Sequence, residues 1–169
     1  MIRTGSHRLF VLGLAALAAG IFATCGGVET SNTCGKLKCT SGAALHVALG
    51  SDAASLVGAT ASVCRNTECY AWPLPSLPAK GSDGTTAIFP GATSVYGTFW
   101  LNANMSITLD IEWRVDDASQ VQDGDHYVVT LTDAAGTATT ILDKTATYQS
   151  LAPNGDGCAP VCSYADLVP

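Results

Sequence analysis

The stretch from Ser106 to Tyr148 constrains the fold more than any other part of the chain. Between residues 107 and 115, in ITLDIEWRV, apolar side chains alternate with polar ones, which is the period of a β-strand with one buried and one wet face. The alternation returns in HYVVTLT at 126–132, and a short turn at 134–136 leads into a threonine-rich segment. Three successive strands predict an all-β fold.

Shorter strand patterns occupy much of the remaining chain. They lie at residues 44–49, 59–63, 85–89 and 95–101 and in a short last strand that ends at Leu167. Between them, Tyr70 to Pro78 holds three prolines in six residues, a pattern that predicts a loop because proline cannot donate a backbone hydrogen bond. No segment shows helical periodicity or an internal repeat. The sequence therefore predicts an antiparallel β-sandwich of about eight strands.

The N-terminus has the layout of an export signal. Arg3 and Arg8 precede an apolar run over residues 9–22, and small residues follow. The run is about 15 residues long, whereas a membrane-spanning helix needs about 20. We expect residues 1–24 to form a signal peptide, 25–33 a flexible tether, and 34–169 a single β-sandwich domain.

The end of this signal resembles the lipobox of bacterial lipoproteins, in which the cysteine is acylated after cleavage. The residues concerned are Phe22-Ala23-Thr24-Cys25, followed by two glycines. Cysteine parity agrees, because the chain has seven cysteines and a lipid on Cys25 leaves six, an even set for disulfides. We therefore expect a lipid-anchored protein of the cell envelope, in the outer membrane or periplasm. The alternative is ordinary cleavage near Ala18 and secretion.

Charge limits the partners of the exported chain. The whole chain carries a net charge of −6, and removal of the two arginines of the signal brings it to about −8. Such a charge repels nucleic acid and anionic membrane surfaces. The expected partners are the membrane, through the lipid, and an envelope protein or glycan.

The six remaining cysteines are expected to form disulfides. Cys64 and Cys69 flank a four-residue loop and can face one another across a hairpin. A zinc site with this spacing would need a second ligand pair and a reducing compartment. Two arrangements remain open for the other four cysteines. Cys34 and Cys39 either bond each other or reach Cys158 and Cys162.

The segment Asp123-Gly124-Asp125-His126-Tyr127 resembles the tyrosine corner of immunoglobulin-like sandwiches. The resemblance implies that the sandwich is immunoglobulin-like. It also implies a buried Tyr127 ring whose hydroxyl bonds the loop backbone, with Asp123 and Asp125 in the corner. Val129 stands where antibody domains have the second cysteine of their core disulfide.

Three further segments, CGG at 25–27, CRNTECY at 64–70 and PNGDGCAPVC at 153–162, make the chain similar to small secreted lipoproteins of the myxobacterial type. That resemblance brings no catalytic residue with it.

Few residue patterns suit catalysis. Asp110 and Glu112 share one strand face, an arrangement that suits the paired carboxylates of a glycosidase, although acidic residues are also ordinary on a wet face. The signal-free chain has two histidines, His46 and His126, both on strand positions. Four acidic residues near one loop have oxygen ligands suited to calcium but lack the EF-hand spacing. They are Asp116, Asp117, Asp123 and Asp125. We predict no catalytic residue, no metal and no cofactor.

The candidate binding residues lie in the proline-rich segment. Tyr70, Trp72, Leu74 and Leu77 would present aromatic and apolar side chains on a stiff backbone. The alternative is that Trp72 covers one end of the core. The sequence thus predicts a membrane-anchored, non-enzymatic binding or structural module. The alternative is a small extracytoplasmic hydrolase.

Overall fold

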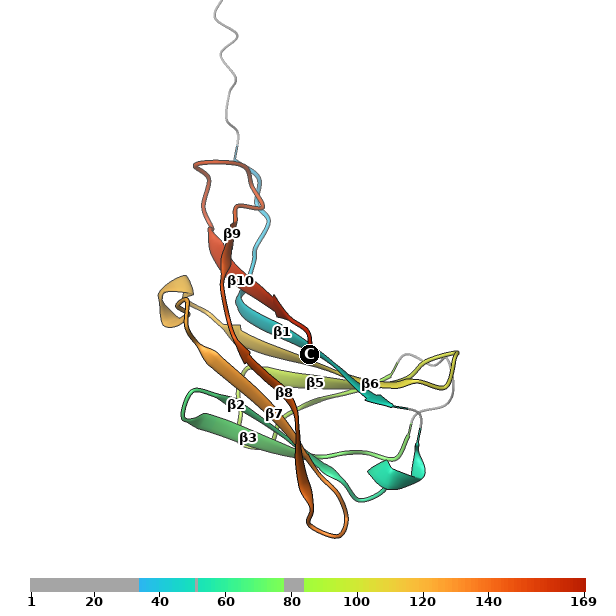
Figure 1. The fold of residues 1–169 in the computed structure, drawn as a ribbon. Helices are drawn as coiled ribbons and strands as arrows, with labels where there is room; N and C mark the ends of the chain where they lie inside the picture. The colour runs from blue at the N-terminus through green and yellow to red at the C-terminus, as the bar shows by residue number, and fades with distance from the viewer. Residues whose placement is uncertain (1–33, 51, 78–83) are drawn as a thin grey trace, which may run out of the picture. The chain divides into compact units, whose positions relative to one another are not determined.

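A computed structural model describes residues 34–50, 52–77 and 84–169, all within the unit Thr33–Pro169. Their strands form two sheets (Figure 1). The strands are β1 (Ser41–Gly50), β2 (Thr60–Arg65), β3 (Glu68–Pro73), β4 (Thr85–Ile88), β5 (Val95–Leu101), β6 (Ile107–Val115), β7 (His126–Thr132), β8 (Ala138–Thr145), β9 (Gln149–Leu151) and β10 (Cys162–Leu167). Two single 3-10 turns, η1 (Ala54–Leu56) and η2 (Ala118–Gln120), complete the described elements.

The fold is an all-β sandwich, as the alternating sequence predicts. One sheet has the strand order β4-β5-β6-β1-β10-β9, and the other has the order β3-β2-β7-β8. The described residues contain ten strands and not about eight, because much of β3 was expected to be a loop and the three-residue strand β9 is too short to produce a periodic pattern. The pairing is also not wholly antiparallel, since β1 and β10 run parallel from Gly42 opposite Tyr164 to Leu45 opposite Leu167.

The core lies between the two sheets, and β6 supplies its centre. Its inward side chains Ile107, Leu109 and Ile111 are fully buried, while the alternating side chains face solvent. Val63 and Val129 are buried equally from the four-stranded sheet. Each such aliphatic side chain contributes about 1.5–3 kcal/mol on burial, so the period-two pattern fixes which face of each sheet turns inward.

The sequence predicted a loop over Tyr70–Pro78, and this prediction is wrong for residues 70–73, which belong to β3. β3 continues to Pro73 and pairs with β2, with Val63 opposite Tyr70 and Thr60 opposite Pro73. β3 is an edge strand, and an edge strand tolerates proline because its outer backbone groups need no partner strand. The proline-rich sequence therefore ends a strand and does not exclude one.

The signal peptide (1–24), the acylation site Cys25 and the tether (25–33) lie outside the described residues. Within the described residues, none of the helical segments has the length and apolar character needed to cross a membrane.

Candidate functional site

Three disulfides involve all six cysteines of the described domain. Cys64 and Cys69 are cross-strand partners in the β2–β3 hairpin and are bonded, as their spacing predicts. Of the two arrangements open for the others, the long-range one forms. Cys34 bonds Cys158, and Cys39 bonds Cys162. Such a disulfide set belongs to an oxidising compartment, which indicates an extracytoplasmic location.

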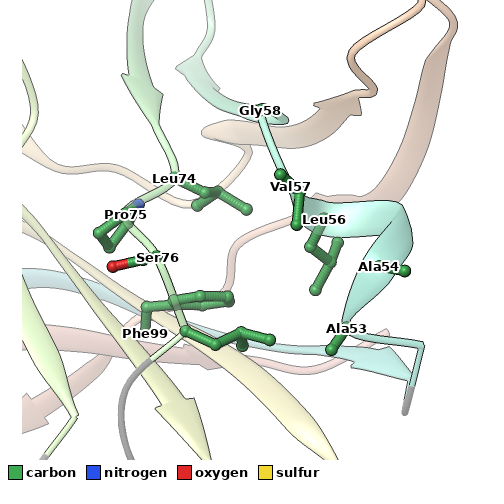
Figure 2. Close-up of a pocket in the computed structure, with 10 residues that line it drawn as sticks. Ala53, Ala54, Leu56, Val57, Gly58, Leu74, Pro75, Ser76 and Phe99 are labelled. Carbon is green, nitrogen blue, oxygen red and sulfur yellow. The ribbon is translucent and has the colours of Figure 1, made fainter.

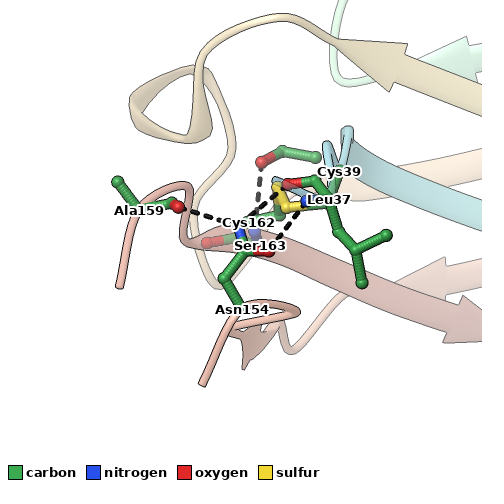
Figure 3. Close-up of a disulfide and its surroundings, with 7 residues drawn as sticks. Leu37, Cys39, Asn154, Ala159, Cys162 and Ser163 are labelled. Atoms are coloured by element: carbon green, nitrogen blue, oxygen red, sulfur yellow. Dashed lines mark hydrogen bonds between the residues drawn. A yellow bond between two sulfur atoms is a disulfide. The ribbon is translucent and has the colours of Figure 1, made fainter. Parts of the chain in front are cut away.

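The two long-range disulfides fasten segment 34–40 to the chain just before and at the start of β10. Figure 3 shows Cys39–Cys162 with the hydrogen bonds around it. The Asn154 amide accepts from Leu37 N at 2.8 Å and donates to Leu37 O at 2.9 Å and Ala159 O at 2.8 Å. Ser163 N donates to Ser41 Oγ at 3.0 Å, at the start of β1. We call this region the clasp, defined as residues 34–40 and 152–162. It brings the starts of β1 and β10 to the same end of the sheet, which accounts for their parallel pairing.

The Tyr127 ring is fully buried, and its edge meets Trp113 at a centroid distance of 6.1 Å. Its hydroxyl bonds the hydroxyl of Tyr148 at 2.8 Å, a side-chain partner where we expected loop backbone. Tyr148 in turn donates to Asp125 Oδ2 at 3.1 Å, so Tyr127 must be the donor in the first bond. Burial raises the pKa of both tyrosines, which keeps these donors protonated.

Asp125 is a buried carboxylate at the end of this chain of hydroxyls, with 2% exposure. Arg65 donates to its Oδ2 from Nε at 3.0 Å and from Nη2 at 2.7 Å, and Asn66 donates to Oδ1 at 2.9 Å. Burial by itself raises the pKa of Asp125, but the bonds from Asn66, the Gln122 backbone N–H and Arg65 outweigh it. The pKa lies below the ordinary value. Asp125 is therefore an ionised, structural residue that links β2 to the corner through its bonds with Arg65.

Two of the other acidic residues near this loop, Asp117 and Asp123, accept hydrogen bonds from backbone N–H groups. Asp123 Oδ1 accepts from Tyr148 N at 2.7 Å, and Asp117 Oδ1 accepts from Ser119 N at 2.8 Å at the start of η2. The second bond lowers the pKa of Asp117. Over the described ranges, no group of three or more His, Cys, Asp or Glu side chains has the arrangement of a metal site. The local contacts assign these carboxylates to loop structure.

Tyr70 and Trp72 do not form the exposed ridge that the sequence suggested. Trp72 is only 6% exposed, and its ring lies 5.7 Å from that of Phe89. A Cβ on Gly97 would lie 2.7 Å from the Trp72 ring, so a glycine is needed beneath it. Tyr70 packs on Trp113 at 5.5 Å. Both side chains point inward because they alternate with the outward Ala71 on an edge strand, and the alternative that Trp72 covers the core is the correct one.

Leu74 and Leu77, the other two candidate residues, line an apolar pocket of about 430 Å³ (Figure 2). Leu74 is held there by its backbone N–H, which donates to Ala59 O at 2.9 Å. Opposite it lies η1, where Asp52 Oδ1 accepts from Ala54 N at 3.0 Å. We call this cavity the end pocket. Its lining consists of Ala53, Ala54, Leu56, Val57, Gly58, Leu74, Pro75, Ser76, Leu77 and Phe99.

The sequence did not identify residues 53–58 and Phe99 as part of a site. Phe99 lies in a segment that the sequence predicts only as a strand, and it is fully buried. Residues 53–58 belong to a loop whose neighbours are set only when β2 pairs with β3. The exposed Val57, a large apolar side chain outside any strand pattern, is the one signal that was present in the sequence.

The residues considered for catalysis form ion pairs or hydrogen bonds on exposed sheet surfaces. His46 Nδ1 lies 2.8 Å from Asp110 Oδ1, and Arg114 Nε donates to Glu112 Oε2 at 2.7 Å. His126 Nε2 lies 2.6 Å from Asp143 Oδ1 on the neighbouring strand. These histidine and carboxylate side chains are 36% or more exposed. They sit on open strand faces and do not converge with the end pocket.

No family model, curated protein or solved structure matches this chain.

Proposed function

We propose that the chain is a lipid-anchored protein of the cell envelope that acts by binding and not by catalysis. Its end pocket takes an apolar group, such as an aliphatic or aromatic side chain, of an envelope protein. The observation that carries the proposal is the end pocket itself, an apolar cavity of about 430 Å³.

The composition of the pocket supports this role. Ser76 supplies the one polar side chain among its described lining residues, and buried Leu56, Leu74 and Phe99 form its walls. Pockets of a few hundred cubic ångströms with mostly apolar walls are typical ligand sites. At the rim, the Val57 side chain is 72% exposed. Exposure of this apolar surface to water is unfavourable, and a partner that covers it gains free energy of binding.

The proposed location in the cell envelope is based on the sequence. Cys25 follows an export signal, and eight residues separate it from Cys34, the first disulfide cysteine. The three disulfides support an oxidising compartment outside the cytoplasm. A lipid on Cys25 would keep the domain beside the membrane, where a partner in the envelope is at high local concentration.

Photo-crosslinking in intact cells tests the binding role. A photoreactive amino acid at Val57 should give one discrete adduct with an envelope protein, whereas the same amino acid at the exposed Thr139 on β8 should not. Ala54→Trp, which fills the pocket from an exposed position, should remove the adduct, and Ala138→Trp on β8 should leave it. An adduct at Val57 that survives Ala54→Trp would refute the pocket as the site. Turnover of a substrate by the purified protein would refute the non-enzymatic role and favour the hydrolase alternative.

A further inference from the structure

The six-stranded sheet carries a second surface, unrelated to the end pocket. We call it the outer face, defined as the side chains of β5, β6, β1 and β10 that alternate with the core residues. The strand register places Tyr96 opposite Glu112, and Glu112 opposite Ala44. One pair further along β6, Asp110 stands opposite His46. Because neighbouring strands are about 4.8 Å apart, the outer face spans about 14 Å from β5 to β10.

The outer face is recessed over the first part of β1, where the outward positions carry little or no side chain. Gly42 has φ +141°, and a Cβ on it would lie 1.9 Å from Trp113 O, so no larger residue fits. Ala44 follows it on this face, and the next outward side chain is that of His46. On the far side Tyr164, which pairs with Gly42, is 42% exposed and forms a wall.

Two hollows result, and the same pair of residues separates them. A hollow of about 310 Å³ lies over Gly42 between Tyr164 and the side chains of Glu112 and Arg114. A second hollow, of about 190 Å³, is lined by Tyr96 and Trp100 of β5. Glu112 and Arg114 line both. The outer face is therefore a trough with aromatic rings at both sides and a charged pair in the middle.

The polar groups of the trough are held in position by one another. The Arg114 guanidinium lies 4.6 Å from the centre of the Tyr96 ring and donates from Nε to Glu112 Oε2 at 2.7 Å. The His46 ring lies between two carboxylates, with Nδ1 2.8 Å from Asp110 and Nε2 3.4 Å from Asp166. These contacts leave further N–H donors and carboxylate lone pairs facing solvent. Groups fixed in this way lose little side-chain freedom when a ligand binds.

This combination matches the chemistry of a sugar. One face of a sugar ring presents C–H groups, which pack on an aromatic ring, and its rim carries hydroxyls that both donate and accept hydrogen bonds. Charge further limits the ligand. Asp110, Glu112 and Asp166 outnumber Arg114, so an anionic polymer is repelled. A protein partner fits less well, because charged pairs divide the aromatic rings and the cores of protein interfaces are depleted in charge.

We propose that the outer face binds an uncharged glycan chain, which lies across the strands from the Tyr96 and Trp100 rings to Tyr164. The sugars stack on these rings, and their hydroxyls bond the Glu112–Arg114 pair between the hollows. This site is independent of the end pocket and goes beyond the proposed function.

Binding of defined polysaccharides tests the proposal. The full chain is purified in a detergent without a sugar headgroup. It is then sedimented with cellulose, chitin and β-1,3-glucan, and titrated calorimetrically with dextran, mannan and the anionic polymer alginate. The wild type should bind at least one uncharged polysaccharide and not alginate. Tyr164→Ala and Trp100→Ala should each weaken binding about tenfold, the size of one lost stacking contact. Val57→Ala, an exposed apolar truncation at the end pocket, serves as the matched control and should bind as the wild type does.

Binding to none of the uncharged polysaccharides, or to alginate alone, would overturn the proposal. So would binding that Tyr164→Ala leaves unchanged, since this half-exposed side chain can be removed without disturbing the core. Thermal unfolding of each variant shows whether it is folded. If Trp100→Ala does not fold, Tyr164→Ala alone decides the outcome. A protein adduct at the outer face without glycan binding would assign this surface to a protein partner.

Discussion

Removal of the two clasp disulfides should show strong non-additivity. Cys34–Cys158 and Cys39–Cys162 have sequence separations of 124 and 123, so each alone closes nearly the whole domain into one loop. Once one of them is formed, the other closes only a small ring made of residues 34–39 and 158–162. The chain entropy that a disulfide removes from the unfolded state grows with loop length. The second bond to form therefore stabilises the domain less than the first.

The expected magnitudes follow from the loop lengths. Closing a loop of more than 100 residues stabilises by about 4.7 kcal/mol, and closing a ring of about a dozen residues by about 3 kcal/mol. Replacing Cys34 and Cys158 by alanine should therefore cost about 3 kcal/mol, because Cys39–Cys162 still closes the long loop. Replacing Cys39 and Cys162 should cost about the same. Removing all four cysteines should cost about 8 kcal/mol, more than the two separate costs together.

Equilibrium unfolding in guanidinium chloride measures these differences, with the free energy of unfolding compared at equal m-value. The Cys64–Cys69 pair, with a sequence separation of 5, provides the control, since its removal should add independently to either variant. Costs for the two clasp disulfides that simply add would refute the shared-loop reasoning. The reasoning would also be refuted if removal of one clasp disulfide alone cost the full amount of about 8 kcal/mol expected for removal of both.

Three further predictions concern the corner and the core. Tyr127→Phe should cost about 1 kcal/mol in urea unfolding, because it removes one hydrogen bond to the half-buried Tyr148 hydroxyl; unchanged stability would show that this bond contributes nothing. The pKa of Asp125 is lowered in the folded state, so its ionised carboxylate stabilises the fold. This stabilisation is fully present above the unfolded-state pKa of about 3.9 and is lost as pH falls through the folded-state pKa. Asp125→Asn should therefore flatten the acid limb of stability below about pH 4, and an unaltered acid limb would contradict this role. Trp72→Ala should lower stability by about 3–5 kcal/mol, the cost of truncating a buried aromatic, and a loss within 0.5 kcal/mol would contradict its inward position.

Local patterns in the sequence were enough to predict most of the strands. In β6, apolar residues at every second position predict both the strand and the face that is buried. Only an extended strand places Ile107, Leu109 and Ile111 on one face, where all three can be buried. The Cys64–Cys69 bridge is equally local, because a four-residue loop decides which residues face each other. His46 was expected on a strand, and it lies on β1 with an exposed side chain beside Asp110.

The rest depends on contacts between distant parts of the chain. Whether Cys34 reaches Cys39 or Cys158 is settled by where the two ends of the domain meet, which no local spacing encodes. The sequence left two positions open for Trp72, because the proline-rich segment hides the edge strand that turns its ring inward. The hydroxyl partner of Tyr127 lies 21 residues away in Tyr148, on the far side of β8. The end pocket likewise joins η1 to Leu74 only after β2 and β3 have paired.

The intact mass of the mature protein tests the central claim, a lipid-anchored and disulfide-closed envelope protein, most directly. The account predicts a chain that begins at Cys25, carries acyl groups on that residue, and lacks six hydrogens because three disulfides are formed. Reduction should add six hydrogens and leave the lipid in place. An unacylated N-terminus upstream or downstream of Cys25, or a free thiol among the six domain cysteines, would contradict it.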